Sequence, residues 1–264
     1  MTLSEWRKQK IQDLRKMVFE PSARQDVTVL IYHFWNMPES SQRFEEVEFS
    51  IFQTWRWCGK LPVKIITNNV CPEMSAFASQ WGGVTPVVSP RLRPGMITSM
   101  SLDMVGYLAE YFDTEFVLIV QNDGFPLRSG FDEFVGPYSY CGPIFTRESR
   151  VKPWTDKIFQ CSIGNGGFCL RRHDICVEAN RLWKKWRWLI NGTGWMTDDT
   201  CYCITFRVLS QKYRKMMRFP SRENARRFGY DRVAGVPVPH ALPFGFHGAN
   251  SFEALMGKFG SEIK

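Results

Sequence analysis

The 264-residue sequence has no uninterrupted apolar run near the roughly 20 residues that a membrane-spanning helix needs. Its first segment, from Met1 to Lys16, is charged throughout and contains no apolar stretch typical of a secretory leader. These absences predict a cytoplasmic protein whose attachment to a membrane, if any, is peripheral.

Motifs of several common enzyme classes are also missing. Neither G-x-G-x-x-G nor G-x-x-x-x-G-K-[ST] occurs, which argues against a dinucleotide-binding domain and a P-loop NTPase. No G-x-S-x-G turn is present, and the 4 histidines form no H-E-x-x-H pair, so a serine hydrolase and a zinc protease are disfavoured. The 8 cysteines form no C-x-x-C pair, and we expect reduced, buried thiols.

Acidic residues are in the minority: 26 Asp and Glu stand against 34 Lys and Arg, for a net charge of +8. The basic excess lies in the C-terminal half, mainly from Arg207 to Arg232, and Arg181 to Trp188 interleaves basic residues with tryptophans. This pattern suits an anionic polymer, since cations neutralise phosphates and aromatic rings stack on sugars or bases. A solvated basic face with tryptophans in the core explains it equally well.

Apolar β-branched runs alternate with helical patterns in the first half of the chain. They predict buried strands at 27–32, 63–67, 84–88 and 116–120, and helices at 4–19, 40–57, 73–81 and 96–111. This alternation is typical of an α/β fold with a mostly parallel central sheet flanked by helices, which binds ligands at the carboxyl ends of its strands.

The alternation loosens after Asp123. Strand-like patterns occur at 138–145 and 162–170, helical ones at 174–188 and 199–213, and the remainder is rich in Arg, Pro and Gly. We predict a single domain over 1–264, with a nucleotide-binding-type sheet in the half at about 1–125 and a basic half at about 126–264.

Four segments carry residues suited to chemistry. Asp123 follows a buried strand, where a carboxylate can hold Mg²⁺ or Mn²⁺ against a diphosphate. Glycines around Asn165 permit close approach of a ligand, and Asp198 and Asp199 precede a helical pattern. His247 lies in an aromatic, Gly-rich turn and is a possible metal ligand. Each segment alone is explained equally well by a turn, a bulge or a helix cap.

Together and in this order, the four segments resemble nucleotide-sugar glycosyltransferases of the GT-A fold. The resemblance is to a bacterial glycosyltransferase-like group with Q-x-D-G, G-N-G-G-F, an acidic pair and P-F-G-F-H-G. In this sequence the motifs are Gln121 to Gly124, Gly164 to Phe168, Asp198 with Asp199, and Pro243 to Gly248.

The resemblance implies a site for a sugar nucleotide, a UDP-sugar above all. Asp123 takes the place of the metal-binding acid of the D-x-D motif, with His247 as the second ligand of Mn²⁺ or Mg²⁺. The chain departs from the motif at Gln121, which replaces the first acid and weakens the expected metal site. The remaining donor-binding positions are Tyr32, His33, Arg91, Asn122, Asn165, Gly166 and Gly167.

The acidic pair matches the position where inverting GT-A enzymes carry their general base. The resemblance therefore implies that Asp199 removes the proton of the acceptor hydroxyl and that Asp198 orients the acceptor or caps the helix. The acceptor is predicted to be an anionic polymer, either a surface glycan or its lipid-linked precursor, or DNA with hydroxymethylated bases. The competing hypothesis is a non-catalytic module that binds nucleic acid or glycan on a degenerate transferase scaffold.

Overall fold

A six-stranded sheet forms the centre of the computed structural model, which describes residues 1–34, 40–93, 96–144, 163–191, 197–232 and 237–263. Four strands are parallel, and β6 runs antiparallel between β4 and β5. The mostly parallel sheet predicted from the sequence is therefore confirmed. The strand order is β3 (Val84–Val88), β2 (Val63–Thr67), β1 (Val27–His33), β4 (Phe116–Val120), β6 (Phe168–Arg172) and β5 (Tyr140–Cys141).

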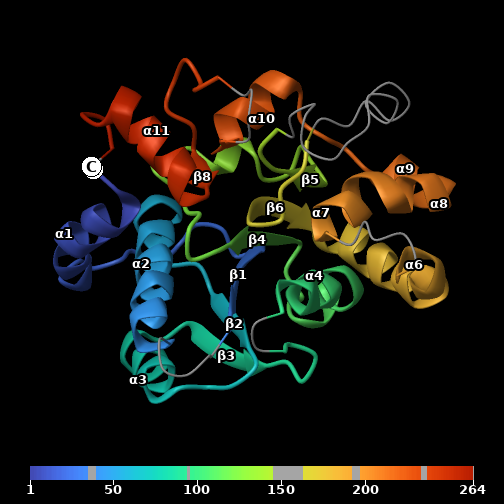
Figure 1. Cartoon of the computed structure of the whole chain (residues 1–264), viewed down its shortest axis with the longest axis horizontal. Helices are drawn as coiled ribbons and strands as arrows, with labels where there is room; N and C mark the ends of the chain where they lie inside the picture. The colour runs from blue at the N-terminus through green and yellow to red at the C-terminus, as the bar shows by residue number, and fades with distance from the viewer. Residues whose placement is uncertain (35–39, 94–95, 145–162, 192–196, 233–236, 264) are drawn as a thin grey trace.

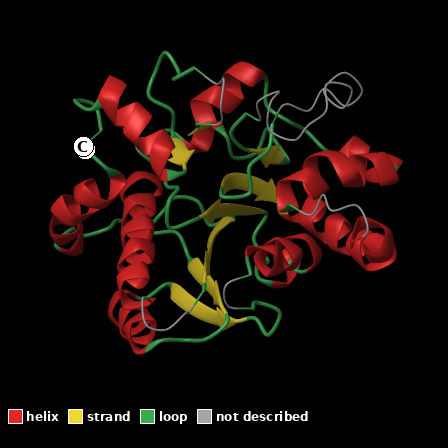
Figure 2. Ribbon diagram, in the orientation of Figure 1, coloured by secondary structure: helices red, strands yellow, loops and turns green. Residues whose placement is uncertain are grey.

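Helices cover both faces of this sheet (Figures 1 and 2). One face carries α1 (Leu3–Arg15), α2 (Ser40–Cys58), α3 (Pro72–Trp81) and α11 (Ala249–Phe259), and the other carries α4 (Ile97–Gly106) and α6 (His173–Asn191). Side chains that alternate along β1 and β4 enter the two layers: Val29 and Leu118 face α2, whereas Leu30 and Ile119 face α4. Because both faces are covered, these strands are apolar at nearly every position.

The C-terminal half departs from the predicted elements. The single helix expected at 199–213 is divided into α7 (Asp198–Thr200), a π-helical turn (Cys201–Thr205), α8 (Phe206–Leu209) and α9 (Gln211–Met216). Ser210 causes the last break, because its backbone is extended and its hydroxyl caps α9 by accepting from the amide of Tyr213.

Further elements lie where no regular structure was expected, at α10 (Arg222–Phe228), β7 (Gly229–Asp231), β8 (Gly245–His247) and α11. The strand predicted at 162–170 is β6, which starts at Phe168, while Ser162 is outside the described residues. Short 3₁₀ turns lie at Leu108–Glu110, before β4, and at Phe131–Glu133, after it.

None of the helices in the described ranges is long and apolar enough to cross a lipid bilayer.

Candidate functional site

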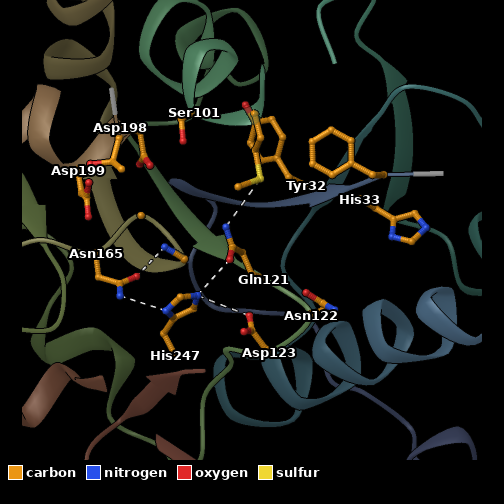
Figure 3. Close-up of a pocket in the computed structure, with 15 residues that line it drawn as sticks. Tyr32, His33, Ser101, Gln121, Asn122, Asp123, Asn165, Asp198, Asp199 and His247 are labelled. Atoms are coloured by element: carbon orange, nitrogen blue, oxygen red, sulfur yellow. Dashed lines mark hydrogen bonds and ion pairs between the residues drawn. The ribbon is translucent and has the colours of Figure 1, made fainter. Parts of the chain in front are cut away.

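A pocket of about 450 Å³ lies at the carboxyl ends of β1 and β4. Parallel α/β sheets bind ligands at this edge, because loops from several strands converge there. Figure 3 shows Asp198 and Asp199 on one side of the pocket, with Gln121, Asp123, Asn165 and His247 grouped nearby. The lining residues are Tyr32, His33, Phe34, Met100, Ser101, Gln121, Asn122, Asp123, Asn165, Gly166, Gly167, Thr197, Asp198, Asp199 and His247.

The floor of the pocket is a tight turn after β4. The amide of Gly124 donates to the carbonyl oxygen of Gln121 at 3.1 Å, and the carbonyl oxygen of Asp123 accepts from the amide of Gly248 at 2.9 Å. Residue 124 must be a glycine, because a Cβ there would lie 2.8 Å from the carbonyl oxygen of Phe246. The motifs at 121–124 and 243–248 are thus joined through their backbones.

Helices α1 and α2, on one face of the sheet, hold this turn in place. Arg7 of α1 donates from Nη2 to the carbonyl oxygen of Asn122, and Nδ2 of Asn122 donates to Oε2 of Glu46 at 2.7 Å. Arg7 and Glu46 also form an ion pair at 3.2 Å. The side chain of Asn122 is therefore turned toward α2, while Asp123 is left for the pocket (Figure 3).

His247, at the end of β8, contacts residues of two other motifs and Asp231. Its Nε2 lies 3.1 Å from Oε1 of Gln121 and 3.5 Å from Oδ1 of Asp123. Its Nδ1 lies 3.0 Å from Nδ2 of Asn165 and 3.9 Å from Oδ2 of Asp231. Burial lowers the pKa of His247, but the surrounding carboxylates, led by Asp231, outweigh it and raise the pKa overall.

The segment 164–167 fits between His247 and the acidic pair because it lacks side chains at two points. A Cβ on Gly167 would lie 2.1 Å from Nε2 of His247, and one on Gly166 would lie 2.2 Å from Oδ2 of Asp198. Asn165 has a positive φ of 132° and accepts at Oδ1 from the amide of Gly167 at 2.7 Å. A larger side chain at residue 166 would displace Asp198, and one at residue 167 would displace His247.

Asp198 is fixed by a fully buried arginine. Nη2 of Arg171 pairs with Oδ2 of Asp198, and the guanidinium carbon lies 4.2 Å from the ring centre of Tyr202 and 5.3 Å from that of Tyr140. Sequence reasoning missed Arg171, although an arginine within an apolar strand signals a buried anionic partner.

Asp199 accepts at Oδ1 from the amide of Thr200 at 2.7 Å. Burial, followed by the negative charge of Asp198, raises the pKa of Asp199 to about 6. A carboxyl group with this pKa is ionised at neutral pH, yet it is a stronger base than an ordinary aspartate.

Other predicted donor-binding residues lie in different surroundings. Tyr32 and His33 both line the pocket, but the hydroxyl of Tyr32 donates to Oδ2 of Asp103 at 3.2 Å and the ring of His33 packs edge to face on Phe44 at 6.1 Å. Consecutive residues of a strand point to opposite faces, which explains why these two separate (Figure 3).

Arg91 does not line this pocket. Its guanidinium carbon lies 3.6 Å from the ring centre of Tyr107, and its Nη2 pairs with Glu110 at 3.3 Å. The role of Arg91 in donor binding stays a prediction.

Asp123 and His247 are the predicted metal ligands. Within the described ranges, no group of three or more His, Cys, Asp and Glu side chains is arranged to hold a metal ion. The oxygens of Asp123 and Gln121 do converge on Nε2 of His247, and carboxylates that raise the pKa of His247 also favour a divalent cation. Asp123, His247 and Gln121 thus supply donor atoms of the kind that a divalent cation takes, but their arrangement does not form a metal site.

The model of the family described as "Protein of unknown function (DUF5672)" matches residues 104–247, which include the first three motifs and the fourth as far as His247. The chain belongs to the DUF5672 family. Comparison with curated proteins finds no match to this DUF5672 chain.

Solved structures of glycosyltransferases are similar to this DUF5672 protein in fold. The galactosyltransferase LgtC, solved with donor and acceptor sugar analogues, has a TM-score of 0.57 and 11% identity, over 89% of this chain and 95% of LgtC. GlyE of Streptococcus pneumoniae TIGR4 has a TM-score of 0.52 and 12% identity, over 83% of this chain and 53% of GlyE. At such identities the likeness shows a shared fold, and the GT-A fold predicted from the motifs is confirmed.

Proposed function

We propose that this DUF5672 protein is a glycosyltransferase that moves a sugar from a nucleotide-diphosphate sugar to an acceptor hydroxyl. The observation that carries the proposal is that Asp123 and His247 line the same pocket as Asp198 and Asp199. These residues are far apart in the sequence, and the fold around them is shared with LgtC. One side of the pocket suits a diphosphate with its cation, and the other suits proton removal.

On the donor side, Asp123 and His247 would hold Mn²⁺ or Mg²⁺. When bound, such a cation supplies positive charge that stabilises the departing nucleoside diphosphate, which we propose to be UDP. Gly166 and Gly167 allow Asp198 and His247 to pack directly against the loop at 164–167. This packing sets both side chains at the wall of the cavity that we propose holds the donor sugar. Asn165 and Tyr32 line the same cavity and would contact the sugar and the nucleoside.

On the acceptor side, Asp199 is the proposed general base. Its carboxylate takes the proton of the acceptor hydroxyl while that oxygen attacks the anomeric carbon opposite the diphosphate, and a single displacement inverts the anomeric configuration. Asp198 is the less suitable base, because its Oδ2 is already engaged by the buried Arg171.

The first experiment tests the donor site. Purified protein is incubated with UDP-sugars and Mn²⁺, and released UDP is measured together with UDP affinity by calorimetry. We expect UDP release, and we expect Asp123→Ala to weaken UDP binding when Mn²⁺ is present. Asp132→Ala, at an exposed acid outside the pocket, is the matched control. If no donor gives UDP release and Asp123→Ala leaves the affinity for UDP unchanged, the proposed transferase activity is refuted.

The second experiment tests the base. Asp199→Asn should reduce turnover on the order of a hundredfold or more with little change in UDP affinity, because a positioned base contributes about 10²–10⁴ in rate. Proton NMR of the product then reports the anomeric configuration. Retention of configuration, or an equal loss of turnover from Asp198→Asn alone, would contradict the assignment of Asp199.

The acceptor is proposed to be an anionic polymer, since basic residues predominate between Arg207 and Arg232. A surface glycan or its lipid-linked precursor and DNA with hydroxymethylated bases both meet this description. A second candidate function is a non-catalytic binding module, which is favoured by the presence of Gln121 where the D-x-D motif has an acid. The UDP-release experiment separates the two.

A further inference from the structure

Helix α6 exposes a face of mixed apolar and basic character. Val177, Arg181, Lys184 and Trp188 are spaced four, three and four residues apart, so they lie along one stripe of the helix. All four are exposed, and Trp188 has 68% of its surface accessible. A tryptophan this exposed is unusual in a globular protein, where its large ring is normally mostly buried.

Further basic and apolar residues surround this stripe near the C-terminal end of α6. Lys185, Arg187 and Leu189 are also exposed, and Leu189 has 40% of its surface accessible. Arg181 pairs with Glu178 and Lys184 with Glu110, whereas Lys185 and Arg187 form no ion pair within the described part of the chain. We call the set Val177, Arg181, Lys184, Lys185, Arg187, Trp188 and Leu189 the α6 face.

The opposite side of the helix is packed normally, so the α6 face is not a sign of poor folding. Cys176, Ala179, Leu182 and Trp183 are buried against the layer that contains α4. Trp183 also occupies the space that a side chain at Gly106 would need, which shows how closely the two helices approach. The helix therefore has one buried apolar side and one exposed side that combines tryptophan, leucine, valine and cations.

We propose that the α6 face docks on an anionic membrane surface. Cations attract acidic lipid headgroups, while an interfacial tryptophan and neighbouring aliphatic side chains insert at the boundary between headgroups and acyl chains. Nucleic acid suits the face less well, because phosphates and bases give the aliphatic side chains of Val177 and Leu189 no apolar environment.

The position of the α6 face connects it with the pocket. Helix α6 ends at Asn191 and α7 begins at Asp198, so a short stretch of chain joins the face to the acidic pair. Figure 1 shows α6 at the end of the molecule opposite α1, and α6 packs there against α8 and α9, which follow α7 in the chain. This part of the inference rests on the proposed glycosyltransferase function: the acceptor would be a hydroxyl carried on a lipid at that surface.

The experiment is co-sedimentation of the full chain with lipid vesicles. We expect binding to vesicles of phosphatidylcholine mixed with phosphatidylglycerol, weak binding to phosphatidylcholine alone, and loss of binding as salt is added. Lys185→Gln with Arg187→Gln should weaken binding about fivefold per charge. Trp188→Ser should weaken the binding that remains at high salt, because apolar insertion is not screened.

Matched controls lie at the other end of the molecule. Lys8→Gln with Lys16→Gln removes the same charge from exposed positions of the α1 region, and Val18→Ser removes an exposed apolar side chain. Neither control should change vesicle binding. Equal losses in the α6 and α1 variants would show that only net charge matters and would overturn the proposal.

Two more outcomes decide between partners and between proposals. Gel shift of duplex DNA that depends on Lys185 and Arg187, with no sedimentation on anionic vesicles, would replace the membrane with nucleic acid and overturn the proposal. Vesicle binding is measured without any sugar nucleotide, so a failure to release UDP would refute the transferase while leaving the docking result intact.

Discussion

Gly166→Ala is expected to damage both stability and activity, because the added methyl group has no space. A Cβ at residue 166 would lie 2.2 Å and 2.4 Å from the two carboxylate oxygens of Asp198. Asp198 cannot easily withdraw, since it is paired with Arg171, which is fully buried. Overpacking of this kind costs about 1–3 kcal/mol in the free energy of unfolding.

The same displacement should lower turnover on the order of a hundredfold, the usual effect of moving a positioned group by about 1 Å. Urea denaturation gives the free energy of unfolding, and UDP release with acceptor present gives the turnover.

Gly257→Ala is the matched control for this substitution. Gly257 is an exposed residue within α11, and a Cβ there would meet nothing within 4 Å. The control should raise the free energy of unfolding by about 0.5–1 kcal/mol, because alanine loses less entropy than glycine in a helix. If Gly166→Ala behaves like Gly257→Ala in both assays, the close packing of residue 166 against Asp198 is wrong.

Three other predictions concern the acidic pair and its surroundings. Transfer should slow as the pH falls below about 6, where Asp199 becomes protonated, and a rate unchanged down to pH 5 would contradict its role as base. Since burial and Asp198 raise the pKa of Asp199 in the folded state, ionisation destabilises the fold at higher pH. Asp199→Asn should therefore raise the free energy of unfolding by roughly 1–3 kcal/mol at pH 7. This gain should shrink between about pH 6 and pH 4, and urea denaturation across that range would measure it. Arg171→Met should lower the free energy of unfolding by about 3–5 kcal/mol, because Asp198 would lose its buried cationic partner. Arg172→Met, at a more exposed ion pair with Asp174, should cost about 1 kcal/mol or less in the same assay.

Local sequence patterns were sufficient to predict the first half of the fold. The strands at 27–33 and 116–120 are apolar at almost every position because helices cover both faces of the sheet, and this produces a strong signal. The C-terminal half was harder to predict. Its short elements, such as β7 and β8, pair with each other across an intervening segment, and three-residue strands have no detectable period of their own.

For the site, the sequence by itself determined which chemical groups are present and that they follow in the order of a known set of motifs. Only the tertiary structure decided which of them meet: Asp123 with His247, Asp198 with Arg171, and Arg91 outside the pocket. The physical reason is that side-chain proximity and burial depend on contacts between distant segments. The burial that contributes most to the pKa of Asp199 and the close fit at Gly166 both arise from such contacts, whereas the charge of the neighbouring Asp198 is a local contribution.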